Sequence, residues 1–100
     1  MTATACEGEF RVGSELGLHA RPAGLFVTLA ARFAAEIEVG RDDGDWVSGR
    51  SVLSLLSLAA GPGARLRLRA VGPDAEAAVA ALGRLLEHPE DGIPGDARGD

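Results

Sequence analysis

Two side chains near the start of the chain, His19 and Arg21, have the types and the spacing that phosphoryl chemistry would need. They lie in the segment HARPA, directly before an apolar run of helical period, so His19 is expected at the N-cap of a helix. Backbone N–H groups at a helix start bind phosphate, and an arginine can bind two phosphate oxygens at once. Imidazole is nucleophilic near neutral pH, so His19 could accept a phosphoryl group, with the N–H groups of Ala20 and Arg21 holding its negative charge.

The same spacing fits a plainer interpretation, in which His19 is an ordinary surface cap and Arg21 is a solvated charge. One histidine before a helix is a weak signal, and the two residues alone favour this plainer interpretation. The chemistry of His19 therefore depends on which elements surround it.

Ser51 is a second candidate, because it precedes the apolar run VLSLLSLAA and can serve as a helix N-cap. A phosphate on its hydroxyl would meet helix N–H groups, which makes Ser51 a candidate regulatory site. A capping role alone is the more economical interpretation. The run over residues 52–58 has more large apolar residues than one buried stripe needs, which indicates an exposed docking patch.

Composition bounds the class of protein and its partners. The 100 residues carry a formal net charge of −5, and an acidic chain disfavours nucleic acid and anionic membranes as partners. The first residues lack the pattern of a signal peptide, and no apolar stretch approaches the ~18 residues of a membrane span, so we expect a cytoplasmic protein. One cysteine, Cys6, and two distant histidines suit neither an internal disulfide nor a metal cluster, so no metal is expected.

Hydrophobic periodicity predicts seven elements. Strands are expected over residues 9–14, 36–39, 46–47 and 64–71, and helices over residues 20–35, after Ser51, and over residues 75–86 with Asp74 as cap. Asp43-Gly44 predicts a hairpin turn between two of the strands. The polar tail, rich in Gly, Pro and Asp, predicts a domain over residues 1–87 and a disordered acidic tail over residues 88–100.

The element order β-α-β-β-α-β-α predicts an α+β fold class. The simplest packing is an open-faced two-layer sandwich, a four-stranded antiparallel sheet with three helices on one face. The other face is then wet, and Arg65, Arg67 and Arg69 would lie on it. We expect these arginines to pair across strands with the outward acids Glu7, Glu9, Glu36 and Glu38. His88 and Cys6 are assigned no role.

Three segments together resemble the family of histidine-containing phosphocarrier proteins, HPr, of the sugar phosphotransferase system. They are GLHARPAGLFVTLAARFAAEIEV (residues 17–39), GRSVLSLLSLAAGPGARLRL (residues 49–68) and GPDAEAAVAALGRLL (residues 72–86). The resemblance spans roughly residues 7–87, and the HARPA motif is specific because the matching element order follows it. It implies the open-faced sandwich, with the strand over residues 64–71 between the first strand and the strand over residues 36–39.

The resemblance also implies site residues and partners. His19 matches the histidine that the family phosphorylates on Nδ1, and Arg21 matches the arginine beside the phosphoryl group. The donor would be Enzyme I, charged from phosphoenolpyruvate, and the acceptors would be IIA proteins of the sugar phosphotransferase system. The protein would be a monomeric carrier rather than an enzyme, and it would need no cofactor.

The family implies a regulatory site and a docking surface as well. Ser51 aligns with a serine that a dedicated HPr kinase/phosphorylase modifies in some lineages, which blocks transfer. Val52, Leu53 and Leu56 fall, with Arg21, where the family docks its partners. We expect the surface around His19 to be locally positive, with Arg50 adding to Arg21 and the helix end.

Some features depart from the sugar carriers. Arg50 stands where many relatives have lysine, and the tail after Leu86 is longer than in many of them. The hairpin over residues 42–45 and the segment VGPDAEAAVAAL are as typical of the nitrogen-related paralogue, NPr. Three alternatives therefore stand beside the sugar carrier: an NPr-type carrier, a regulatory binding module controlled through Ser51, and a small ligand-binding domain without covalent chemistry.

Overall fold

The computed structural model describes residues 4–42 and 44–93. In chain order the elements are β1 (Ala5–Arg11), α1 (Ala20–Ala30), β2 (Glu36–Arg41), β3 (Trp46–Ser48), α2 (Val52–Leu56), β4 (Arg65–Val71), α3 (Ala75–Glu87) and a 3-10 helix η1 (Pro89–Asp91). The predicted order of seven elements is confirmed, and η1 is an addition to it. No helix in the described ranges is both long and apolar enough to cross a membrane.

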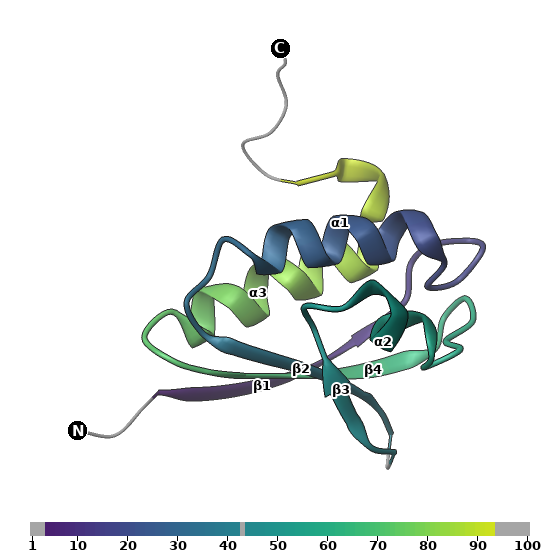
Figure 1. Cartoon of the computed structure of the whole chain (residues 1–100). Helices are drawn as coiled ribbons and strands as arrows, with labels where there is room; N and C mark the ends of the chain where they lie inside the picture. The colour runs from purple at the N-terminus through teal and green to yellow at the C-terminus, as the bar shows by residue number, and fades with distance from the viewer. Residues whose placement is uncertain (1–3, 43, 94–100) are drawn as a thin grey trace.

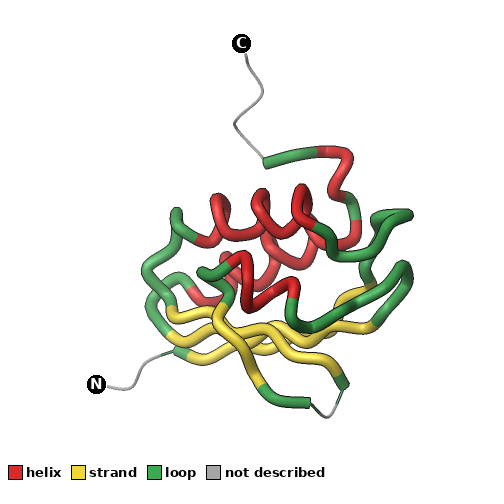
Figure 2. Tube along the Cα trace, turned by 45° about the vertical axis from the view of Figure 1, so that its right-hand side comes forward, coloured by secondary structure: helices red, strands yellow, loops and turns green. Residues whose placement is uncertain are grey.

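The four strands form one sheet in the order β1-β4-β2-β3, and each neighbouring pair is antiparallel. All three α-helices cover one face of this sheet, and the other face is left open (Figure 1, Figure 2). The fold is therefore the predicted open-faced α+β sandwich. β4 lies between β1 and β2, as the family resemblance implied.

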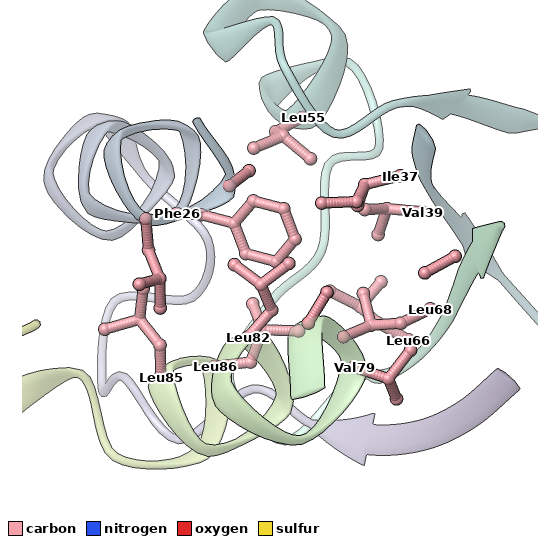
Figure 3. Packing of buried hydrophobic residues seen from close by; sticks show 14 of the residues in the cluster. Phe26, Ile37, Val39, Leu55, Leu66, Leu68, Val79, Leu82, Leu85 and Leu86 are labelled. Atoms are coloured by element: carbon pink, nitrogen blue, oxygen red, sulfur yellow. The ribbon is translucent and has the colours of Figure 1, made fainter. Parts of the chain in front are cut away.

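The core lies between the helices and the sheet. The ring of Phe26 in α1 is fully buried, and it lies among Leu55 from α2, Leu82 from α3 and Ile37 from β2 (Figure 3). Burial of each such side chain stabilises the fold by about 1.5–3 kcal/mol. The short α2 is thus held against α1 by Leu55, although five residues are too few for a helix to be stable alone.

Two element bounds differ most from the prediction; smaller differences include the end of β1 at Arg11, not at residue 14, and the end of β2 at Arg41, not at residue 39. β1 begins at Ala5, not at residue 9, because it pairs with β4 over its whole length. Its first inward positions, Cys6 and Gly8, are too small to show the apolar alternation of a strand. α1 ends at Ala30, not at residue 35, and Phe33 lies in the turn that follows.

Arg50 explains the early end of α1. Its guanidinium donates to the carbonyl oxygens of Ala30 at 3.2 Å, Phe33 at 2.9 Å and Ala35 at 2.7 Å. Carbonyl groups at a helix end have no intrahelical partner, so these hydrogen bonds satisfy the chain where it leaves the helix.

Asp74 begins α3, but its carboxylate does not cap that helix. It accepts instead from the backbone N–H groups of Ala34 and Ala35, both at 2.9 Å, in the turn between α1 and β2. The N–H of Ala34 does most to hold the pKa of Asp74 below its ordinary value; the N–H of Ala35 and the charge of Arg50 act in the same direction, against partial burial. The Asp74 carboxylate, which was expected to cap α3, therefore links the start of α3 to the turn between α1 and β2.

The open face of the sheet carries the arginine row. The prediction of acidic partners is right for Arg69, whose Nε donates to Glu38 at 3.1 Å, and for Arg65, which lies 4.0 Å from Glu9. It is wrong for Arg67, for which the described residues offer no ion pair. Arg67 instead lies over the Trp46 ring at 4.4 Å, as Arg69 does at 4.1 Å.

The boundary expected at residue 87 also needs correction. Residues 88–93 are not a disordered tail, because Pro89–Asp91 forms η1 and the Ile93 side chain is buried in the core. Residues 94–100, and with them the rest of the expected tail, lie outside the described residues. Asp43 of the predicted turn lies outside the described residues as well. Beside it, the Gly44 N–H donates to the Arg41 carbonyl at 3.0 Å.

Candidate functional site

His19 is the N-cap of α1, as predicted. Its backbone is extended, with φ −97° and ψ −171°, and its carbonyl accepts from the Ala23 N–H at 3.0 Å. The side chain makes no capping hydrogen bond and is half-buried. His19 therefore caps α1 through its backbone, and its imidazole takes no part in starting the helix.

The loop before His19 fixes its position. Gly17 has φ +78°, and a Cβ there would come within 2.6 Å of the Ala60 carbonyl oxygen, so only glycine fits this conformation and this close approach. The same carbonyl accepts from the Leu18 N–H at 2.9 Å, and the Leu18 side chain is buried. His19 therefore begins a helix whose entry is tied to the segment after α2.

The first turn of α1 offers two backbone donors beside the imidazole. Ala20 and Arg21 are its first two residues, and the N–H groups at those positions have no intrahelical acceptor. Pro22, the third residue, has no N–H and is buried in the first turn, where a proline costs no helical hydrogen bond. The helix dipole adds partial positive charge at this end.

The Arg21 side chain is exposed, and within the described residues it has no hydrogen bond or ion pair. A groove of about 670 Å³ opens beside it. Its lining comes from the loop Gly13, Ser14, Glu15 and Leu16, from His19, Arg21, Pro22 and Leu25 at the start of α1, and from Pro89 and Glu90 of η1. His19 and Arg21 thus line one open space at the start of α1.

Arg50 does not join this cluster. Its guanidinium binds the carbonyl groups at the carboxyl end of α1, whereas His19 begins the helix. The expectation that Arg50 adds positive charge around His19 is therefore wrong, because the helix end already uses its donors.

The predicted residues of α2 differ in exposure. Ser51 is the N-cap of α2, and its hydroxyl accepts from the Ser54 N–H at 3.2 Å. Val52 and Leu56 are half-buried against the core, whereas Leu53 is 80% exposed. Leu53 is therefore the member of the predicted docking set whose side chain is free to contact a partner.

Sequence reasoning missed several residues of the groove. Leu16 is 77% exposed beside His19, and Glu15 and Glu90 supply two carboxylates to the lining. A glycine two residues before a helix start was the available signal for Gly17. No local pattern could place η1 beside α1, because their contact joins distant parts of the chain.

The structure also brings one group of possible metal ligands together. Ligand atoms of His88, Glu90 and Asp91 lie within 4.8 Å of one another, and all three residues are exposed. The spacing of cysteines and histidines in the sequence did not predict this group. Exposed acidic clusters are common without an ion, so we assign it no metal.

An open-faced sandwich with an uncommitted histidine at the start of its first helix defines a class of small phosphoryl-carrying domains. A family model described as "PTS HPr component phosphorylation site" matches residues 6–88. The chain therefore belongs to the HPr family.

Individual relatives agree with this assignment. The phosphocarrier protein HPr of Haloferax volcanii is 47% identical over 77 residues, which cover 76% of this chain and 86% of the relative. The HPr-like protein Crh of Halalkalibacterium halodurans is 41% identical over 81 residues, covering 81% and 95%. The crystal structure of HPr from Bacillus anthracis aligns with a TM-score of 0.78 and 37% identity, covering 83% of this chain and 98% of the other.

Proposed function

We propose that this protein carries a phosphoryl group on His19, which it receives from Enzyme I and passes to IIA proteins. The observation that carries the proposal is the uncommitted imidazole of His19, which shares an open groove with the free guanidinium of Arg21. A carrier must bind its cargo reversibly, and a phosphoryl group on imidazole nitrogen is readily given up.

The transfer step uses the lone pair of the His19 Nδ1. This pair forms a bond to the phosphorus atom of the donor, while the bond from phosphorus to the donor breaks and leaves its electrons there. The proton stays on Nε2, so no general base is required. In the second transfer an acceptor attacks the same phosphorus, and the P–N bond returns its electrons to the imidazole.

Arg21 and the helix start would hold the phosphoryl oxygens between the two transfers. The guanidinium can donate two hydrogen bonds, and the N–H groups of Ala20 and Arg21 can donate two more. Charge-assisted hydrogen bonds shift the balance toward the phosphorylated form without locking the group in place, because the groove remains open to water and to partners.

The docking surface would surround this groove. Leu16 and Leu53 are exposed apolar side chains, and Arg21 is a cation beside the reacting atom. A small interface of this composition suits partners that must bind, exchange a phosphoryl group and leave. Acidic residues on the partner would be steered toward Arg21.

The test is phosphorylation by Enzyme I and phosphoenolpyruvate, followed by the intact mass. One phosphate is expected on the unmodified protein and none on His19→Ala. The matched control is His88→Gln, which removes the other histidine and should still accept one phosphate. Phosphorylation that survives His19→Ala would refute the proposal. Transfer onward to sugar-type and nitrogen-type IIA proteins in parallel would then decide between the sugar carrier and the NPr-type carrier.

A second candidate, regulation through Ser51, is supported by the position of this hydroxyl at the N-cap of α2. The Ser51 hydroxyl is half-buried and accepts from Ser54, so a phosphate there would replace a capping contact with stronger ones to the same N–H groups. An HPr kinase/phosphorylase with ATP should give an acid-stable phosphate that Ser51→Ala abolishes. Equal labelling of Ser51→Ala would exclude this site.

A further inference from the structure

The groove beside His19 has a second wall, which comes from the carboxyl-terminal part of the described chain. Arg21 and Leu25 line one side of it, and Pro89 and Glu90 of η1 line the other. Figure 1 shows η1, in yellow, beside the amino-terminal end of α1. Residues 89–90, which composition placed in the expected disordered tail, therefore help to shape the space that a phosphoryl group would enter.

This wall is fastened to the domain. Ile93, three residues after Glu90, is only 7% exposed and belongs to the core. The Asp91 N–H donates to the His88 carbonyl at 3.1 Å, and the Asp91 carboxylate accepts from Arg84 of α3 at 3.2 Å. That ion pair is exposed and adds little, so the buried Ile93 is the main anchor. Glu90 is thereby held at the groove.

The loop over residues 13–16, which also lines the groove, is tied to the same end of α3. The Gly13 N–H donates to the Leu86 carbonyl at 2.9 Å, and a Cβ on Gly13 would overlap the Glu87 carbonyl. The loop that carries Glu15 is thus hydrogen-bonded to the carboxyl end of α3, and the turn that carries Glu90 follows that end in sequence. They present two carboxylates to the groove that holds one free cation, Arg21.

The charges around Glu90 determine what it can do. His88 Nδ1 lies 3.6 Å from its carboxylate, and Asp91, Glu15 and Arg21 are the other charged residues of η1 and the groove. In the described residues Glu90 and Arg21 form no ion pair with each other. The carboxylate is therefore available to oppose a negative charge that arrives on His19, and to compete with it for Arg21.

We propose that Glu90 is a positioning residue, which weakens the hold of Arg21 and the helix start on a phosphoryl group at His19. This inference rests on the proposed function of His19. A phosphoryl group adds close to two negative charges to the groove, so repulsion by a fixed carboxylate raises the free energy of the phosphorylated form. The carrier is thereby kept ready to give up its phosphoryl group.

The first experiment uses inorganic phosphate as probe and does not depend on Enzyme I. Phosphate is titrated at low ionic strength at about pH 8, where imidazoles are uncharged, and binding is read from the NMR shifts of the Ala20 and Arg21 amides. Glu90→Gln should bind phosphate about two- to fivefold more tightly than the unmodified protein, and the difference should shrink in high salt.

Two variants control this measurement. Glu76→Gln removes an exposed carboxylate from the first turn of α3 and should leave phosphate binding unchanged. Glu90→Asp keeps the charge and should behave as the unmodified protein does. Equal affinities of Glu90→Gln and the unmodified protein, or no binding by either, would overturn the proposal.

The second experiment measures the equilibrium with Enzyme I at a fixed ratio of phosphoenolpyruvate to pyruvate. Glu90→Gln should raise the ratio of phosphorylated to free protein by a similar factor. If no protein is phosphorylated while the phosphate titration shows the expected difference, the proposed function fails and the charge arrangement stands. If Glu90→Gln and the unmodified protein are phosphorylated to the same extent, the role of Glu90 fails and the carrier function stands.

Discussion

Arg21 differs from Arg50 and Arg69 in what its guanidinium binds. Arg50 donates to three carbonyl groups and Arg69 to a carboxylate, whereas Arg21 has no such contact within the described residues. A side chain that the fold does not use is available for a ligand. This is the physical reason to propose that Arg21, rather than the arginine row on the open sheet, would bind the oxygens of a phosphoryl group on His19.

Replacement of Arg21 by alanine should therefore reduce phosphorylation without loss of stability. If the transition state loses the equivalent of one charge-assisted hydrogen bond, about 1.5–3 kcal/mol, the rate should fall roughly 10- to 150-fold. The measurement is the initial rate with Enzyme I, together with the urea midpoint. Arg65→Ala, on the opposite face, is the control and should keep the full rate; an equal loss in both variants would contradict the role of Arg21.

A second prediction at the residue scale concerns Gly17 and the stability of the protein. Gly17→Ala should destabilise the protein by about 1–3 kcal/mol, because a Cβ is strained at φ +78° and meets the Ala60 carbonyl. Chemical denaturation measures the loss. Gly61→Ala is the matched control, since a Cβ there meets no atom within 4 Å. A Gly17→Ala protein as stable as this control would show that the loop is not held as described.

At the scale of elements, the turn between α1 and β2 is fastened from two directions. Arg50 donates to its carbonyl groups, and Asp74 accepts from the N–H groups of Ala34 and Ala35. Arg50 and Asp74 are both distant from this turn in sequence, and neither belongs to α1 or β2. The periodic pattern therefore predicted that α1 continues to residue 35, and Asp74 was expected to cap α3.

The pKa of Asp74 predicts an acid-dependent stability. Because the folded state lowers this pKa, the carboxylate contributes stability above its unfolded pKa of about 3.9, and the contribution is lost as pH falls through the folded value. Asp74→Asn should be less stable at pH 7 and should lose less stability on acidification. Urea midpoints at pH 7 and pH 3 test this. Glu76→Gln should keep the full dependence, and the same dependence in Asp74→Asn would rule out Asp74 as its source.

Two leucines of α2 separate folding from docking. Leu55→Ala should cost about 2–5 kcal/mol, because this side chain is buried against Phe26, whereas Leu53→Ala should change stability little. If Leu53 contacts partners, its variant should transfer phosphoryl groups more slowly at limiting partner concentration. Stability is measured by denaturation and transfer by initial rates. A normal rate in Leu53→Ala would remove Leu53 from the docking surface.

At the scale of the whole molecule, sequence reasoning was right about the architecture and about the position of His19 at the start of α1. The alternation of Leu66, Leu68 and Ala70 and the stripe that includes Phe26 and Leu29 are strong periodic signals, and both are buried as expected. The second half of the groove was not predictable in the same way. Pro89 and Glu90 follow no periodic pattern, and a single buried Ile93 draws them back onto the domain.

The two faces of the molecule also differ in chemistry. The helices cover one face of the sheet (Figure 2), and His19 and the groove lie at the start of α1. The open face carries the arginine row, of which Arg67 and Arg69 lie over Trp46. Phosphoryl chemistry at His19, or docking of a partner at the groove, should therefore have little direct effect on the surroundings of Trp46. The sheet between them is a packed layer, with Leu66 and Leu68 fully buried.

Trp46 consequently gives the protein its own optical reference. It is the only tryptophan of the chain, and two guanidinium groups lie over its ring. Its emission should change strongly when the sheet comes apart and hardly at all when a partner docks at the groove. Fluorescence of the unlabelled protein can thus separate a variant that has unfolded from one that has only lost its chemistry.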